Sequence, residues 1–395
     1  MKRTNAIWTI ALLIMTGLAG CKQSATQSDD LITVDVTKNY SKKDLILQDF
    51  MDVEYIALET NDEFLTQGFV LDIGKDIIIV KNRVNSGDIF IFDRKGKAIK
   101  KINRLGQGGQ EYTYILGVTL DEDNGEIFVN DHYVNKLLVY DLDGNFKRSF
   151  NHKEGSMYDR IYNFDRENLI CHDGSFDNDG VGNKQSFTVI SKQDGSIIKE
   201  IQIPYEKQKS TILTAIDEAQ GMVYSAGPRN QELILYNSSS ILVEPSSDTI
   251  YRFQSDYSMI PFFVRTPSIQ SMDPEIFLFP GVLTDRYYFL QTVKKEFNFE
   301  TSIGFPITDL MYDKQEKSIF EYIVYNDDYS NKKTVNLGHE IFFVNSNEVA
   351  FLQKLEAHEL IEDYENGKLK GKLKELAATL DEESNPVIML IKHKK

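Results

Sequence analysis

The sequence predicts an all-β fold in which four-stranded antiparallel blades form a β-propeller. Three observations predict it. Strand–turn–strand segments recur with turn glycines at Gly96, Gly144 and Gly195, spaced 48 and 51 residues apart. Helical periodicity is nearly absent before the C-terminus, which excludes βαβ folds. The 395 residues, with 41% hydrophobic and 26% charged side chains, are those of a globular protein long enough for a ring of repeats.

The N-terminus has the features of an export signal. Lys2 and Arg3 precede an apolar run over 6–18, which is shorter than the roughly 20 residues that cross a bilayer. The residues Leu18-Ala19-Gly20-Cys21 resemble the lipobox of bacterial lipoproteins. We therefore predict a signal peptide over 1–20 and lipid attachment at Cys21, and an ordinary signal peptide with a coincidental cysteine is the alternative.

A flexible tether is predicted over 21–43, beginning with the polar segment Lys22–Asp30. With several acyl chains on Cys21, the mature protein would stay on the membrane of the cell envelope. We expect the outer membrane, with the periplasmic or surface side left open. Removal of residues 1–20 changes the net charge from −16 to −18, because 60 acidic residues then face 42 basic ones.

The repeating unit has four strands, which we call a, b, c and d. Its c–d hairpins lie over Ile89–Ile102, Lys136–Phe150 and Ser186–Ile201. The a–b pairs that precede them lie over Val70–Val80, Val118–Val129 and Tyr162–Ile170. Asn-Gly and Asp-Gly turns within these segments are hairpin signals, because tight turns need positive φ. A lone sheet of this kind leaves a face uncovered, and radial stacking of copies covers it.

The later repeats are less regular. Asp248–Arg265 and Phe305–Tyr325 each have the pattern of a c–d pair, whereas the blade edges over 211–237 have no clear pattern. From Asp44 onward about 350 residues remain, which at about fifty per blade makes six or seven blades. We therefore predict one propeller domain over 44–395.

The C-terminus is predicted to hold a helical insert and a ring-closing strand. Leucines at helical spacing over about 354–381 predict an insert that packs on the domain, interrupted at Gly367 and Gly371. A membrane or partner helix is the alternative. The strand Pro386–Lys394 is expected to pair with Asp52–Glu59 in one blade, so that both ends of the chain close the ring.

Composition excludes several classes of protein. The acidic balance argues against nucleic-acid binding, which needs a basic face for phosphates. The 2 cysteines exclude a disulfide scaffold and a multi-cysteine metal site. With Cys21 assigned to the lipid, Cys171 lies in an apolar strand and is predicted to be a buried thiol of the core.

A ligand is expected on the face formed by the b–c and d–a connections, which are longer and chemically richer than the other turns. The side chains predicted to line this face carry charge, amide or ring groups: Arg83, Arg104, Gln107, Glu111, Tyr112, His132, Tyr133, His152, Tyr158 and Arg160. A structural role is the alternative for Arg104 to Tyr112, in which this loop joins neighbouring blades.

Signals of catalysis are weak. The chain has no Gly-x-Ser-x-Gly elbow, His-Glu-x-x-His pair or phosphate-binding loop, and we predict no cofactor. His132, His152 and His172 fall on one predicted face, so a calcium or zinc site is an alternative. Residues 177–180 (Asp-Asn-Asp-Gly) resemble part of a calcium loop but lack its terminal acidic ligand, and we interpret them as an Asx turn.

Several stretches resemble a known family: VEYIALET over 53–60, RLGQGGQEY over 104–112, VYDLDGNF over 139–146, DTIYRF over 248–253 and SNPVIMLIK over 384–392. With these stretches the chain resembles the six-bladed β-propeller lipoproteins of Bacteroidetes, which are distantly similar to NHL-repeat propellers. The usual loop has Pro after its second Gly, where this chain has Gly109. The resemblance implies six blades, a cell-envelope location and a link to nutrient or glycan acquisition.

We predict a cell-envelope lipoprotein that acts as a non-enzymatic ligand-binding or interaction scaffold. Its partner would be a glycan, a peptide or an envelope protein, and no nucleic acid. Two alternatives stay open: a propeller enzyme of the lactonase or lyase type with a metal in the central channel, and a structural subunit of an outer-membrane complex. Metal content would distinguish the first alternative, and a large exposed apolar patch the second.

Overall fold

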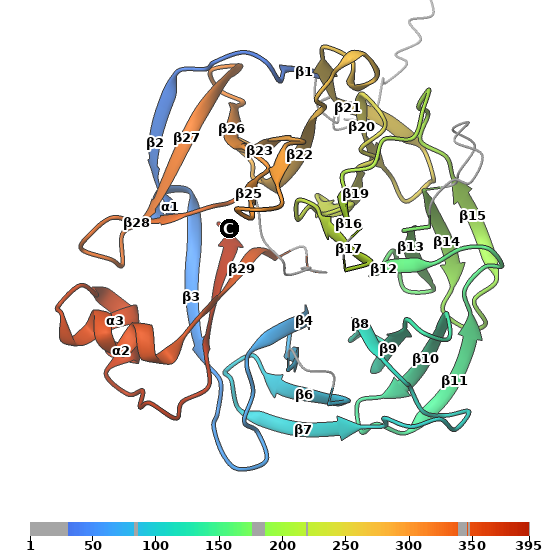
Figure 1. Ribbon diagram of the computed structural model, residues 1–395. Helices are drawn as coiled ribbons and strands as arrows, with labels where there is room; N and C mark the ends of the chain where they lie inside the picture. Colours follow the sequence, from blue (N-terminus) through green and yellow to red (C-terminus); the bar gives the residue numbers. More distant parts are fainter. Residues whose placement is uncertain are drawn as a thin grey trace, which may run out of the picture. The chain divides into compact units, whose positions relative to one another are not determined.

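Six sheets stand around a central axis and form the ring in Figure 1, which is a six-bladed β-propeller. The computed structural model describes residues 31–82, 86–175, 186–218, 220–338, 346 and 348–394. The fold class predicted from the repeats and from the family resemblance is therefore confirmed.

The first three blades are regular, and each runs in chain order from its innermost strand to its outermost. Blade 1 comprises β4 (Phe69–Ile73), β5 (Ile77–Lys81), β6 (Asp88–Asp93) and β7 (Ala98–Asn103). Blade 2 comprises β8 (Ile115–Asp121), β9 (Glu126–Asp131), β10 (Lys136–Asp141) and β11 (Phe146–Asn151). Blade 3 comprises β12 (Tyr158–Asn163), β13 (Asn168–Asp173), β14 (Phe187–Ser191) and β15 (Ile197–Ile201).

The predicted turns have the expected backbone conformation. Gly96, Gly144 and Gly195 have φ of 83°, 82° and 73°, in the left-handed region that favours glycine. At Gly144 a side chain would also meet Ile102, whose Cγ2 lies 2.9 Å from the place of a Cβ atom. This turn therefore requires glycine for its conformation and for its contact with blade 1.

A hairpin separates blades 3 and 4. It comprises β16 (Leu213–Asp217) and β17 (Met222–Ala226), which pair with each other, and neither pairs with another described strand. Blade 4 then comprises β18 (Leu233–Tyr236), β19 (Ser239–Leu242), β20 (Thr249–Phe253) and β21 (Met259–Thr266). The hairpin occupies part of the stretch over 211–237 that the sequence pattern leaves unassigned. The expected c–d pair over 248–265 is β20 and β21.

Blade 5 carries two additions. Its strands β22 (Ile276–Leu283), β23 (Tyr287–Lys294), β26 (Ile307–Asp313) and β27 (Ser318–Asn326) follow a 3₁₀ helix at Ile269–Ser271. A small hairpin, β24 (Phe297–Asn298) with β25 (Ile303–Gly304), is inserted between β23 and β26. β28 (Lys333–Val335) pairs with β27.

Both ends of the chain close the ring in blade 6, as predicted. Its described strands are β29 (Val349–Leu355), β30 (Val387–His393) and β3 (Met51–Ala57), and β30 pairs antiparallel with both others. A short helix, α1 (Leu47–Phe50), leads into β3. The insert between β29 and β30 comprises α2 (Ala357–Glu365) and α3 (Gly371–Ala377). Leu360 and Leu373 belong to the core between blades 5 and 6, so the insert is packed.

The N-terminal part differs from the predicted tether. β1 (Ile32–Asp35) pairs in parallel with β21, and β2 (Lys42–Ile46) pairs in parallel with β27. Ile32 and Val34 are buried because the stretch ITVD alternates apolar and polar side chains, which suits a strand with one covered face. Residues 32–43 therefore contain β1 and the start of β2, and Lys22–Asp30 lies outside the described residues.

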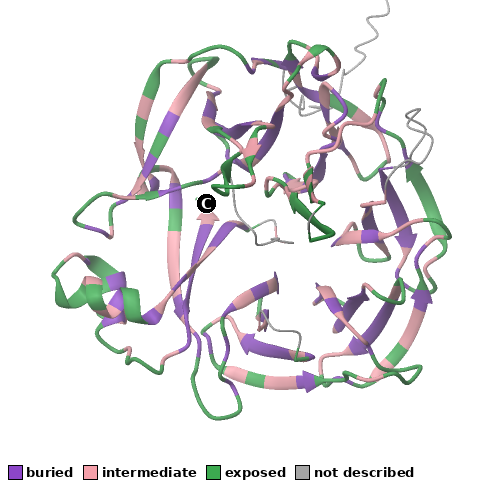
Figure 2. Ribbon diagram, viewed as in Figure 1, coloured by how far each residue is buried: buried purple, intermediate pink, exposed green. Residues whose placement is uncertain are grey.

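Hydrophobic cores lie between neighbouring blades. Side chains that alternate along one strand point to opposite neighbours, so that Leu137 and Val139 pack toward blade 3, and Leu138 and Tyr140 toward blade 1. Cys171 is buried in the core between blades 2 and 3, as predicted, and burial raises the pKa of its thiol. Figure 2 shows the middle strands of these blades mostly buried. None of the described helices has the length and apolar character that crossing a membrane requires.

Candidate functional site

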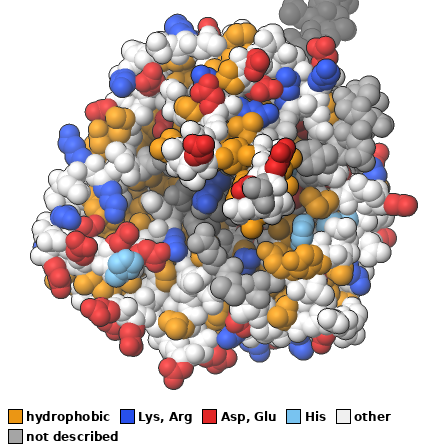
Figure 3. Space-filling model, in the orientation of Figure 1, with side chains coloured by type: hydrophobic (Ala, Val, Ile, Leu, Met, Phe, Trp, Pro, Cys, Tyr) orange, Lys and Arg blue, Asp and Glu red, His pale blue; other side chains and the backbone are white. Residues whose placement is uncertain are grey.

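The b–c and d–a side of the ring carries added structure, in line with its predicted longer connections. The hairpin β16–β17 is a d–a connection, and β24–β25 lies in a b–c connection. In Figure 1 both hairpins lie over the middle of the ring. Figure 3 shows a central hollow with Lys or Arg side chains in its depth on this face. Arg83 of the predicted site and the expected Asx turn over 177–180 lie outside the described residues.

The predicted loop over 104–112 makes contacts that join neighbouring blades. Nε of Arg104 donates to the carbonyl oxygen of Gly144 in blade 2 at 2.9 Å. The buried hydroxyl of Tyr112 donates to the carbonyl oxygen of Gly87 at 2.7 Å and accepts from the Arg104 amide at 2.8 Å. Oε2 of Glu111 accepts from the amide of Gly108 at 2.8 Å. These contacts favour the structural role for this loop, in which Gln107 is exposed.

Two further predicted residues are buried between blades 2 and 3. The ring of His152 accepts from the amide of Tyr158 through Nδ1 at 3.2 Å, and its Nε2 lies 3.0 Å from Oδ1 of Asn130. This geometry places the proton on Nε2, so the ring is neutral. Burial lowers the pKa of His152 to about 4, although Asp173 and Asp131 oppose the change. The ring of Tyr158 packs 4.7 Å from that of His152, centroid to centroid.

His132 and Tyr133 meet a third aromatic side chain on the predicted face. The ring centroid of Tyr133 lies 5.1 Å from that of Tyr114 and 5.5 Å from that of His132. The Tyr133 side chain is 71% exposed. We call Tyr114, His132 and Tyr133 the aromatic platform. Figure 3 shows histidine and hydrophobic side chains side by side on this face, over the part of the ring where Figure 1 labels β8 and β12.

A buried carboxylate holds the two loops that carry the aromatic platform. Asp131, at the end of β9, accepts from the amide and hydroxyl of Thr113 at 2.5 and 2.9 Å, and from the amide of Tyr133 at 3.1 Å. Asp173, at the end of β13, repeats this arrangement with the amides of Met157 and Ser175. The aromatic platform thus rests on a structural element that recurs in the blades.

The last predicted residue, Arg160, lies beside a cluster of Asp159, His172 and Glu232. One ligand atom from each of these three residues lies within 4.8 Å of the other two. Nδ1 of His172 and Oδ1 of Asp159 are 2.7 Å apart. Nη1 of Arg160 donates to the main-chain oxygen of Asp159 at 3.0 Å. The cluster spans two blades, because Asp159 and His172 belong to blade 3 and Glu232 directly precedes β18 of blade 4.

Burial and the neighbouring charges shift the pKa of each side chain in this cluster. Burial alone would lower the pKa of His172, but the adjacent Asp159 carboxylate raises it above its ordinary value. Burial likewise opposes ionisation of Asp159, and His172 overcomes this, so that the pKa of Asp159 is lowered. Burial raises the pKa of Glu232. His172 is therefore not grouped with His132 and His152 in one three-histidine site, but with two carboxyl groups.

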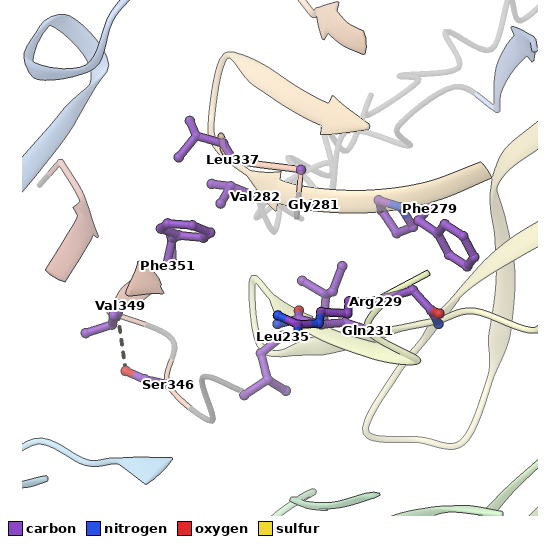
Figure 4. Close-up of a pocket in the computed structure, with 15 residues that line it drawn as sticks. Arg229, Gln231, Leu235, Phe279, Gly281, Val282, Leu337, Ser346, Val349 and Phe351 are labelled. Atoms are coloured by element: carbon purple, nitrogen blue, oxygen red, sulfur yellow. Dashed lines mark hydrogen bonds between the residues drawn. The ribbon is translucent and has the colours of Figure 1, made fainter. Parts of the chain in front are cut away.

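One cavity inside the ring is not predicted from the sequence. It lies among the inner strands β18, β22 and β29 of blades 4, 5 and 6. Figure 4 shows Arg229 and Gln231 on one side of it, and Val282, Leu337 and Phe351 on the other. Arg229 and Gln231 lie within the stretch over 211–237, to which the sequence pattern assigns no strands. Glu232 lies in the same stretch and is not identified for the same reason.

A second cavity, of about 550 Å³, opens among the a–b turns. Its wall includes the buried ion pair of Lys192 and Asp121, whose Nζ and Oδ2 are 2.7 Å apart. Lys192 also donates to the main-chain oxygen of Asp165. The ion pair ties blade 3 to blade 2 at this cavity.

Fold and sites together define a six-bladed β-propeller with polar and aromatic groups gathered on the b–c and d–a side. The chain belongs to the family described as a domain of unknown function, DUF4934, whose sequence profile matches residues 31–392.

A solved structure from Bacteroides shares the fold. A Bacteroides fragilis protein, which is named as an exported protein, is 16% identical, with a TM-score of 0.59 over 92% of this chain and 100% of that chain. A Bacteroides vulgatus member of the DUF4221 family is 13% identical, with a TM-score of 0.45 over 88% of this chain and 99% of that chain. No curated protein matches the sequence. At 16% identity the likeness to the Bacteroides fragilis protein shows the fold alone, and the resemblance to six-bladed propellers of Bacteroidetes agrees with it.

Proposed function

We infer that the protein is an exported, lipid-anchored protein that binds a saccharide on the aromatic platform. The observation that carries this proposal is that Tyr133 is 71% exposed on the predicted face while its ring contacts those of Tyr114 and His132. The apolar C–H faces of sugar rings pack on aromatic rings, and the hydroxyl groups of the sugar remain free for polar neighbours. No enzymatic step is needed for this role.

Preorganisation supports a binding role for the platform. Asp131 fixes the loops of Tyr114 and Tyr133 through Thr113 and the Tyr133 amide, so the rings lose little freedom when a ligand arrives. Val134, 50% exposed, extends the apolar surface beside Tyr133. An exposed group of rings on a rigid scaffold is typical of ligand sites.

The test is saccharide binding by purified protein. A glycan array followed by calorimetry should identify a bound saccharide, and Tyr133→Ala should weaken its binding by at least about tenfold, as loss of roughly 1.4 kcal/mol implies. Tyr133→Trp should retain binding, because it keeps a ring. Tyr364→Ala on α2 is the matched control, since Tyr364 is partly exposed on the helical insert. The proposal fails if no saccharide binds, or if Tyr133→Ala binds like the parent protein.

Lipid attachment is the second part of the proposal and rests on Leu18-Ala19-Gly20-Cys21. In cells fed a labelled fatty acid, the protein should carry the label and sediment with membranes. Cys21→Ser should lose both properties, whereas Cys171→Ser should keep the label. Label on the Cys21→Ser protein would refute attachment at this residue.

The hairpin β16–β17 favours a second candidate function, docking of an envelope protein. Ile216, Met222, Val223 and Tyr224 are exposed there, at 70%, 50%, 65% and 45%. An extended segment of a partner could pair with a free edge of the hairpin and cover these side chains. Crosslinking in cells from position 216, compared with position 364, would detect such a partner.

A further inference from the structure

We propose that Asp159, His172 and Glu232 form a binding site for a divalent transition-metal ion of the Zn²⁺ type. A ligand atom from each residue lies within 4.8 Å of the others, so one ion can contact all three after small side-chain movements. The site is separate from the aromatic platform and does not depend on the saccharide proposal.

The backbone of blade 3 directs Asp159 toward His172. The pairing of β12 with β13 shifts register between Tyr158 and Arg160, so that Asp159 is the extra residue of a β-bulge. Bulges re-aim side chains and recur next to functional sites. His172 pairs with Arg160, directly beside the bulge, and this places its ring next to the Asp159 carboxylate.

Blade 2 has the same bulge with different chemistry. There the register shift falls between Ile115 and Gly117, which makes Leu116 the extra residue, and Asn130 holds the place of His172. Asn130 donates to the main-chain oxygen of Tyr158 in the next blade at 2.7 Å, a structural contact. Blade 3 replaces the leucine by an aspartate and the asparagine by a histidine. Two metal-ligating residues therefore stand together where the repeat has an apolar and an amide side chain.

Glu232 supplies an independent observation. Its Oε2 is buried and has no hydrogen-bond partner among the described residues, while Oε1 lies 3.3 Å from Nδ2 of Asn230. A buried carboxylate oxygen without a partner is costly, and native proteins rarely keep one without a ligand or water. An ion held between blades 3 and 4 would satisfy this oxygen.

The donor set selects the kind of ion. One imidazole nitrogen and two carboxylates suit Zn²⁺ and similar first-row ions, whereas Ca²⁺ prefers six to eight oxygen donors. The ion would take the place of the proton between Nδ1 of His172 and Oδ1 of Asp159, and this proton is released to solvent. Three protein ligands leave a coordination position for water or a ligand.

Calorimetry with ZnCl₂ on tag-free protein, stripped with a chelator, tests the proposal. We expect one ion per chain, with cobalt substitution giving the visible absorption of a bound, low-symmetry Co²⁺ site. Glu232→Gln, His172→Gln and Asp159→Asn should each weaken binding by at least about tenfold, the scale that even outer-shell changes reach. His358→Gln, which removes an exposed histidine from α2, is the matched control and should bind like the parent protein.

The proposal is overturned if the parent protein binds no ion at one equivalent, or if the three variants bind it with unchanged affinity. Circular dichroism of each variant checks the fold. Glu232→Gln keeps the size and shape of the side chain, so its zinc affinity decides between the outcomes if His172→Gln does not fold. Tyr133→Ala should bind zinc normally, so failure of the saccharide proposal leaves this result intact.

Discussion

His152 gives the protein a defined sensitivity to acid. The ring is buried between blades 2 and 3, and burial lowers its pKa from 6.5 to about 4. In the unfolded chain the ring returns to its ordinary pKa and takes up a proton below pH 6.5. Between about pH 6.5 and pH 4 the unfolded state therefore binds more protons than the folded state, and the free energy of unfolding falls as the pH falls.

The size of this effect follows from the two pKa values. The full difference between about 6.5 and about 4 corresponds to about 3.4 kcal/mol, at 1.36 kcal/mol per unit. Going from pH 7 to pH 4.5 removes about 2.5 kcal/mol of this, because pH 4.5 still lies above the lower pKa and the unfolded ring is already partly protonated at pH 7. His152→Gln keeps a donor for Oδ1 of Asn130 and cannot titrate. The variant should thus lose about 2.5 kcal/mol less than the parent protein over this pH range, even if its stability at pH 7 is lower.

Equilibrium urea unfolding at pH 7 and pH 4.5 measures the difference. His358→Gln, at the exposed histidine of α2, should show the pH dependence of the parent protein. If His152→Gln and the parent protein lose equal stability on acidification, His152 does not change its proton binding on folding. The neutral, Nε2-protonated ring assigned to it would then be wrong.

Three further variants test the packing. Leu373→Ala, in the core between α3 and blades 5 and 6, should lower the free energy of unfolding by about 3 kcal/mol in urea titration. Tyr112→Phe removes the hydroxyl bonded to Gly87 and should cost about 1–2 kcal/mol, with saccharide binding unchanged. Lys192→Met leaves Asp121 buried without its partner and should cost about 3–5 kcal/mol by thermal and urea unfolding, part of which Asp121→Asn should restore.

The sequence pattern predicts the fold where the blades repeat closely. Strand patterns and turn glycines identify blades 1 to 3, since the middle strands are buried between neighbouring blades and the turns at Gly96, Gly144 and Gly195 need positive φ. It misses β1 and β2 because parallel addition to a blade edge depends on what that edge offers, which local sequence does not encode. It also leaves β16–β17 unassigned, because Ile216, Met222 and Val223 are exposed and follow no core pattern.

The candidate site is predicted only in part, for a related reason. His132 and Tyr133 lie in a b–c loop and are predicted from it. Tyr114 lies in the preceding d–a loop, which the Asp131 carboxylate holds beside them through Thr113. Arg104 and Tyr112 have the chemistry of ligand contacts, and the structure uses them to join blades. Residue type alone does not separate these two roles, because both require polar groups on loops.

The contrast between blades 2 and 3 shows where such information lies. Asp131 and Asp173 perform the same structural task at the ends of β9 and β13, so an acidic residue there indicates scaffold and not chemistry. One residue earlier, Asn130 and His172 differ, and the bulged residue differs with them, as leucine in blade 2 and aspartate in blade 3. Polar or charged side chains at two positions that are apolar or amide in another blade lower the stability of the fold through lost packing and desolvation, unless another interaction compensates for them. Comparing blades within one chain thus pairs His172 with Asp159, whereas the sequence pattern alone groups His172 with His132 and His152.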